Sequence, residues 1–446
     1  MKKFNLLIFI FYIFNVNIFS QNFIVNNYSP GEGLTFTNDN GAKFTMRGYI
    51  QPYFDLKVYS DTIGDDFWTR KISKPQFRVR MRRVRVRMFG NTANEKIHFR
   101  LQTELTGSPE VEGSIGTMLM DAFVSYKATK YFKITFGQRA PQTDHRSMFM
   151  LSNTLQFTER SRLASFAVIR EFGLFLEHRI KVAPQKYIRP YLIVSSGDGF
   201  MSLARNYGGL KYGGRIDFVP FGLFTRMGQF RQADIVRENS PKLVFGGYYS
   251  YNDGISSRRG RVGGDIVFLN SDQEESLPDY QKYGVDFLFK YKGFSMLGEY
   301  LNTKANIPSD IAYYIRNNGT LSTTVTEGEF NYPLNKMMLG SAYNIQMGYI
   351  FKNLFSIDAR YTHFKPDEYS FLNNGTFYSR PNYYTLGFTK YLDNNYSLKI
   401  QGSITYVDLA EGANSNVATG DPSAPWYQTQ SSGHEMIYRL ITTFSF

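Results

Sequence analysis

The chain has 446 residues, no cysteine and a formal net charge of +13. Without cysteine it has no disulfide, thiolate metal site, cysteine nucleophile or lipid anchor on an N-terminal cysteine. Its positive charge attracts anions.

The N-terminus has the pattern of a secretory signal peptide. Met1, Lys2 and Lys3 precede an apolar run, residues 4–19, that ends at the small residue Ser20. We expect residues 1–20 to be cleaved; the alternative is an uncleaved membrane anchor. Residues 21–42 then form an N-terminal extension. Because an exported chain seldom meets nucleic acid, the positive charge predicts small anionic solutes and lipid as partners instead.

Long alternating segments dominate the rest of the chain. From Lys43 to Tyr59, apolar and polar residues alternate without a break. Strands of soluble domains usually stop after about 5–6 residues, whereas a tilted membrane strand needs about 9–11. The next alternating segment along the chain is 77–88. The later alternating segments are 97–105, 118–127, 131–138, 166–179, 187–195, 207–218, 223–230, 243–251, 283–291, 294–301, 342–352, 355–364, 383–392, 396–407 and 438–446.

Short turns such as "KATK" and "VPFG" alternate with long polar connectors. This arrangement is typical of an all-β transmembrane antiparallel β-barrel with short periplasmic turns and long extracellular loops. Residues 43–446 are expected to form it. Because strand number must be even and the segments number seventeen, one segment is miscounted. Sixteen strands are the favoured count, and eighteen result if residues 261–270 form a further strand.

The last segment, "YRLITTFSF", is amphipathic and ends on Phe446, with Phe444 on the same face. Such a terminal strand is the type that the barrel insertion machinery of a Gram-negative outer membrane prefers. We therefore expect the protein to lie in that membrane.

The segment "FRVRMRRVRVRM" carries six arginines: Arg78, Arg80, Arg82, Arg83, Arg85 and Arg87. A regular strand would turn three of them into lipid, at about 2–4 kcal/mol each near the midplane. A one-residue β-bulge at Arg82 and Arg83 instead places all six in the lumen. Arg47 and Arg100 are expected on inward faces of the flanking strands.

Arginine stays charged, and its planar fork matches the oxygens of phosphate, sulfate or carboxylate. Two interpretations of the stripe stay open. The arginines form an anion pathway, or they are structural and pair with acids. The candidate acids are Glu104, Glu110, Glu112, Asp144 and Glu159.

The arginine-rich strand, "LMDAFVSYKATKYFKITFGQRAP" and "TLQFTERSRLASFAVIREFGLFLEH" together resemble the phosphate-selective porins O and P. The resemblance implies a 16-stranded, usually trimeric outer-membrane porin that passes anionic solutes such as phosphate. It also implies a constriction loop, about residues 139–164, whose Arg139, Arg146, Arg160 and Arg162 either meet the wall arginines or are held by Asp144 and Glu159. Phosphate selectivity itself is not carried over.

Five histidines, His98, His145, His178, His363 and His434, show no spacing typical of a catalytic triad or a metal site. We therefore expect no enzymatic activity, no metal and no cofactor. The alternatives to an anion porin are a general-diffusion porin with structural arginines and a non-conducting accessory barrel for secretion or surface assembly.

Overall fold

The computed structural model describes residues 23–25, 28–59, 75–106, 118–199, 205–261, 263–264, 266–315, 319–322, 333–373, 381–408 and 434–446. The expected signal peptide, Glu110 and Glu112 lie outside these residues. In the part of the chain that the structure describes, no helix is long and apolar enough to cross a membrane.

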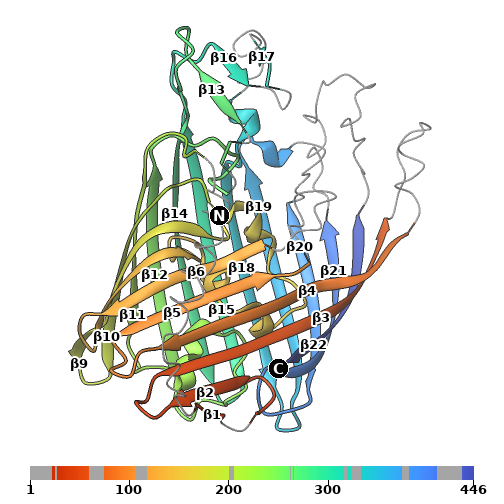
Figure 1. Cartoon of the computed structure of the whole chain (residues 1–446). Coiled ribbons are helices and arrows are strands. Elements are labelled where there is room, and N and C mark those ends of the chain that lie inside the picture. Colours follow the sequence, from red (N-terminus) through yellow and green to blue (C-terminus); the bar gives the residue numbers. More distant parts are fainter. Residues whose placement is uncertain are drawn as a thin grey trace, which may run out of the picture.

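Within this part of the chain, 16 antiparallel strands form a closed barrel (Figure 1). The barrel closes where β22 (Glu435–Ser445) pairs with β3 (Lys43–Tyr59). The other wall strands are β4 (Gln76–Asn91), β5 (Ile97–Glu104), β6 (Met118–Lys127), β7 (Phe132–Arg139), β8 (Glu171–His178), β10 (Lys186–Ser195), β11 (Lys211–Val219), β12 (Lys242–Asn252), β14 (Asp279–Tyr291), β15 (Phe294–Asn306), β18 (Gly340–Ile350), β19 (Phe355–Pro366), β20 (Asn382–Tyr391) and β21 (Leu398–Asp408). Strand β9 (Ile180–Ala183) continues β8 and shares its neighbour β10. The expected 16-stranded barrel is confirmed.

Five short strands lie outside the wall or extend its edge. In the N-terminal extension, β1 (Phe23–Val25) pairs with β2 (Leu34–Asn38), which pairs with the first residues of β3. Strands β13 (Val267–Leu269), β16 (Tyr313–Ile315) and β17 (Leu321–Ser322) form a separate sheet beyond the long-loop end, at the top of Figure 1. Residues 261–270 therefore add no wall strand, which excludes a count of eighteen.

The predicted strand 223–230 is wrong, and so is the tight turn predicted at "VPFG". Residues 220–241, here called the inner connector, join β11 to β12 and contain the 3-10 helix η3 (Thr225–Phe230). Arg226 and Met227 have φ values of 48° and 56°, a left-handed conformation that a strand does not contain.

The inner connector folds into the barrel at its short-turn end. The Tyr396 hydroxyl donates to the carbonyl oxygen of Ala233 at 2.7 Å, and the backbone N–H of Gln156 donates to Gln232 Oε1 at 2.9 Å. Its apolar residues therefore alternate with polar ones because they meet the interior of the barrel, not because they face lipid.

A second chain segment crosses the lumen. Residues 140–170, here called the inserted segment, join β7 to β8 and contain α3 (Arg146–Phe149), η1 (Ser152–Thr154) and η2 (Arg162–Phe166). The predicted strand from residue 166 begins only at Glu171, because Phe166 stacks on Phe364 of the wall at 5.4 Å between ring centroids. Two further 3-10 helices, η4 (Leu334–Lys336) and η5 (Phe371–Asn373), lie in long-loop connections.

The apolar surface divides between the outside of the barrel and patches within it. On β4, Phe77, Val79 and Met81 are exposed on the outer face, as expected for contact with lipid. Inside, Leu163 and Phe166 are fully buried against wall and loop residues. This packing fixes the inserted segment in place and leaves open space on the β4–β7 side.

Candidate functional site

Strand β4 contains the bulge that the arginine pattern predicted. Gln51 of β3 lies opposite Arg83 and Pro52 lies opposite Met81, so Arg82 is the extra residue. The bulge resets the alternation of the strand. Arg82 and Arg83 consequently both point to the inside of the barrel, where they meet the inserted segment.

Both of these arginines bind one carboxylate. Arg83 Nη2 lies 2.7 Å from Glu159 Oε2, and Arg82 donates to both oxygens of the same group. Burial alone would raise the pKa of the Glu159 carboxyl. The charges of Arg82 and Arg83 outweigh burial and hold this pKa well below its usual range.

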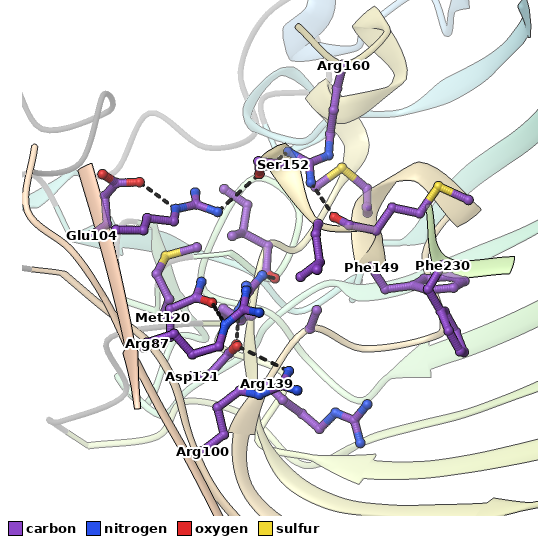
Figure 2. Close-up of a pocket in the computed structure, with 18 of the residues that line it drawn as sticks. Arg87, Arg100, Glu104, Met120, Asp121, Arg139, Phe149, Ser152, Arg160 and Phe230 are labelled. Carbon is purple, nitrogen blue, oxygen red and sulfur yellow. Dashed lines mark hydrogen bonds and ion pairs between the residues drawn. The ribbon is translucent and has the colours of Figure 1, made fainter. Parts of the chain in front are cut away.

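The next two inward arginines differ in their partners. Arg85 Nε lies 2.6 Å from Glu104 Oε2, and Arg85 Nη1 donates to Ser152 Oγ at 3.1 Å (Figure 2). Arg87 donates to the neutral Gln102 at 2.7 Å. Among the described residues, no carboxylate pairs with Arg87.

The ends of the predicted stripe lie away from the others. Arg78 and Arg80 are exposed toward the long-loop end, with the Arg80 guanidinium 5.8 Å from the ring centroid of Tyr53. At the short-turn end, Arg47 Nη2 lies 3.3 Å from Glu32 Oε2.

A second bulge shapes the neighbouring wall. The register between β5 and β6 shifts at Met120, which places Met120 and Asp121 together beside the lumen. Asp121 accepts from Arg170 Nε at 2.6 Å and lies 3.9 Å from Arg100 Nη1. One acid thus holds two arginines that come from different elements (Figure 2).

The four arginines assigned to the predicted loop have separate positions. Arg139, at the end of β7, pairs with Glu177 of β8. Arg160 donates to Ser147 O at 2.9 Å, Met150 O at 2.8 Å and Ser152 Oγ. Arg162 does not line the open space between the inserted segment and the β4–β7 wall.

Burial, followed by the charges of Arg83 and Arg85, lowers the pKa of the Arg160 guanidinium. Crowding among like charges therefore adds to the cost of burying this cation, and an anion placed between them would relieve it.

Arg146 anchors the inserted segment. Its side chain is fully buried, with Nη2 2.7 Å from Asp217 Oδ1 and Nε 2.8 Å from Asp286 Oδ1. Arg215 binds the same two carboxylates at 2.7 and 2.5 Å. Lys282 Nζ holds the adjacent Asp144 at 2.6 Å. None of these residues lines the open space beside the β4–β7 wall, so Arg146 is held as part of the scaffold.

The open space is a cavity of about 550 Å³ between the β4–β7 wall, the inserted segment and the inner connector. Among its described lining residues the acids are Glu104, Asp121, Glu159 and Glu177. The cations outnumber them: Arg82, Arg83, Arg85, Arg87, Arg100, Lys133, Arg139, Arg160, Arg170, Arg189, Arg231 and Arg261. The cavity is therefore electropositive even after its ion pairs are counted.

Several of these residues escaped the sequence analysis. Arg189 of β10 shares a face with Tyr187 and Tyr191, opposite the apolar residues Ile188, Pro190 and Leu192, a signal that would have placed it inward. Arg231 sits in the inner connector, whose fold the alternation pattern concealed. In the part of the chain that the structure describes, no group of three or more His, Asp or Glu side chains is placed to hold a metal ion.

The closed barrel, its apolar outer face and the electropositive lumen define the class of a membrane-spanning β-barrel channel. Residues 60–189 match the model of the family described as phosphate-selective porin O and P. This is the family that the sequence motifs resemble, and the match supports an outer-membrane porin. No curated protein shows a significant sequence match to the chain.

The solved structures that resemble the chain include the following three. OmpT of Vibrio cholerae in its trimer form is 10% identical, with a TM-score of 0.48 and coverage of 91% of this chain and 99% of that one. The outer membrane channel DcaP of Acinetobacter baumannii is 12% identical, with a TM-score of 0.47 and coverage of 92% and 99%. OprB of Pseudomonas putida is 10% identical, with a TM-score of 0.46 and coverage of 92% and 95%.

Proposed function

We propose that this protein is a passive outer-membrane porin that passes small anionic solutes along the arginine-lined side of its lumen. The observation that carries the proposal is the cationic excess of the cavity lining. Arg87, Arg160, Arg189 and Arg231 line this cavity, and among the described residues none of them has a carboxylate partner.

The paired arginines contribute in a different way. Glu159 and Glu104 hold Arg82, Arg83 and Arg85 in fixed orientations, which reduces the side-chain entropy that an anion must remove on binding. The two interpretations left open by the sequence thus combine. The arginines paired with carboxylates have a structural role, and the cations without carboxylate partners attract the anions.

The arrangement also suits permeation. A channel needs sites that are attractive enough to be entered and weak enough to be left. Successive inward residues of a strand lie about 7 Å apart, so Arg83, Arg85 and Arg87 offer an anion neighbouring sites. Phosphate and other oxyanions fit the guanidinium fork.

The proposal includes a location and an assembly. We place the barrel in the outer membrane of a Gram-negative bacterium, as a homotrimer delivered with a cleaved signal peptide. The insertion machinery would recognise the last strand, on which Phe444 is exposed on the outer face and the backbone of Phe446 pairs with Gly48.

The test is the reversal potential of the purified protein in a planar bilayer under a potassium chloride gradient, followed by addition of inorganic phosphate. We expect anion-selective sign and a reduced chloride current with phosphate. The double variant Arg87→Gln, Arg160→Gln should lose most of this preference, whereas Arg205→Gln, an exposed change on a long loop, should keep it.

Weak selectivity in the wild type and no phosphate effect would leave a general-diffusion porin with structural arginines. Absence of conductance would favour an accessory barrel. Either result contradicts the proposal.

A further inference from the structure

The cavity has an apolar side as well as a cationic one. Met148, Phe149 and Met150 line it from α3 and the residue that follows, and Met227 and Phe230 line it from the inner connector. In Figure 2, Phe149 and Phe230 lie on the opposite side of the cavity from Arg87 and Arg100. The wall strands therefore supply most of the charge, and the two segments folded into the lumen supply much of the apolar surface.

Part of this apolar surface is accessible, although Met148 and Met150 are buried. Met227 is 60% exposed, and Phe149 and Phe230 are half-buried. The rings of Phe149 and Phe230 meet edge to face, with centroids 6.2 Å apart. Single exposed apolar residues are ordinary, but clustered aromatic and methionine side chains in a lumen mark a surface that gains free energy when an apolar group covers it.

Cations adjoin the apolar groups directly. The Arg189 guanidinium lies 5.2 Å from the centroid of Phe230, and the guanidiniums of Arg100 and Arg139 each lie 5.4 Å from the centroid of Phe123. A flat anion in this space would place its charged group against a guanidinium and its ring against an arginine plane or an aromatic edge. A bare inorganic oxyanion uses only the first of these contacts.

The size of the cavity agrees with such an occupant. Its volume of about 550 Å³ falls within the range of roughly 300–1,000 Å³ typical of sites for small organic molecules.

We propose, on the basis of the proposed anion passage, that the cavity between the β4–β7 wall and the Met148–Met150 and Met227–Phe230 surfaces is a selectivity site for small organic anions with an apolar or aromatic body. Such solutes bind there more tightly than anions of equal charge that lack a large apolar group. The arginines set the sign of charge that enters, and the methionine and phenylalanine side chains select among the anions.

The experiment compares two permanently charged sulfonates of equal charge, one with a phenyl group and one with only a methyl group. Single-channel chloride current through the purified full-length protein is titrated with benzenesulfonate and, separately, with methanesulfonate. Partial burial of a phenyl group predicts a half-blocking concentration roughly tenfold lower for benzenesulfonate.

Two variants locate the effect. The double variant Met227→Asn, Phe230→Ser should bring the two sulfonates to nearly equal potency; asparagine accepts the left-handed backbone at position 227. The control Phe221→Ser changes an exposed phenylalanine of the same connector that does not line the cavity, and it should keep the tenfold difference.

Equal potency of the two sulfonates in the wild type would overturn this inference. In that case the anion-selective reversal potential would still stand, so the proposed function would survive. A channel without anion selectivity would instead overturn the proposed function and this inference together. If the double variant fails to assemble, the wild-type comparison alone decides the question.

Discussion

Glu159 is the group whose removal tests the charge balance of the lumen most directly. Replacing Glu159 by Gln removes one negative charge while Arg82 and Arg83 stay in place. An anion roughly 7 Å away gains about 0.6 kcal/mol from one unit of charge at the dielectric constant of water, and about 2.4 kcal/mol at an effective constant of 20. Because water and salt in a conducting lumen would screen this charge, we expect a result near the lower value.

The corresponding change is a rise of roughly threefold or more in the permeability ratio of chloride to potassium. The assay is the reversal potential in a planar bilayer, with Glu274→Gln, an exposed loop change of equal charge, as the control. Removing a charged partner from these hydrogen bonds also costs about 1.5–3 kcal/mol per bond lost, so the variant barrel should lose heat resistance in detergent gels. A ratio that stays constant or falls would refute the assignment of Glu159 to the anion passage.

Three further outcomes follow from the same contacts. The lowered pKa of Glu159 means that its pairing with arginine stabilises the fold fully above about pH 4.5, the ordinary pKa of the group, and that this stabilisation is lost only as pH falls toward the lowered pKa. Reversal potentials measured from pH 8 to 5 should therefore show no step from Glu159. A step that E159Q abolishes would contradict this expectation. Arg146→Met leaves two buried carboxylates short of a cation, at a cost of about 3–5 kcal/mol, and should raise current noise as the inserted segment loosens, whereas Arg205→Met should leave the noise as it is. Deleting Arg82 removes the bulge and leaves regular alternation, so the barrel should assemble. Deleting Val84 turns an arginine toward lipid and should impair assembly. Equal yields of folded protein from the two deletions would show that the bulge does not set which residues of β4 face the lumen.

The arginine strand could be predicted in detail because its constraint is local. Lipid on one side and water on the other dictate which face each residue takes, and the double arginine fixes where the phase must change. The barrel class followed from the same alternation, repeated along the chain. The alternation alone gave seventeen segments, and sixteen strands were favoured because the strand number must be even and because the resembled family has sixteen.

The inner connector was predicted wrongly because an alternating pattern shows that one face of a segment meets apolar surroundings. The pattern does not show whether those surroundings are lipid or the packed interior of the barrel. Phe224 is buried against the inside of the barrel, and an apolar residue that faces a packed lumen looks in sequence like one that faces lipid. The left-handed residues Arg226 and Met227 leave no glycine or asparagine signal, so the break in extended structure was hidden.

The partners of the candidate site could not be predicted for another reason. Glu159 meets Arg82 and Arg83, and Arg146 meets Asp217 and Asp286, across chain separations that only the closed barrel bridges. Which acid pairs with which arginine depends on the path of the inserted segment, and no local sequence pattern predicts that path.

The direct pairing of β22 with β3 has a consequence for the order of assembly. This seam joins strands from the two ends of the barrel sequence, so its loop-closure entropy is the largest in the wall. Meanwhile the inserted segment is held by Arg82 on one side of the barrel and by Asp286 on another. Both contacts lie inside the wall, where the segment packs more easily before the wall is sealed. We therefore expect the seam to close last, after the interior has been packed, so that a variant that delays packing would accumulate as an open sheet with two unpaired edges.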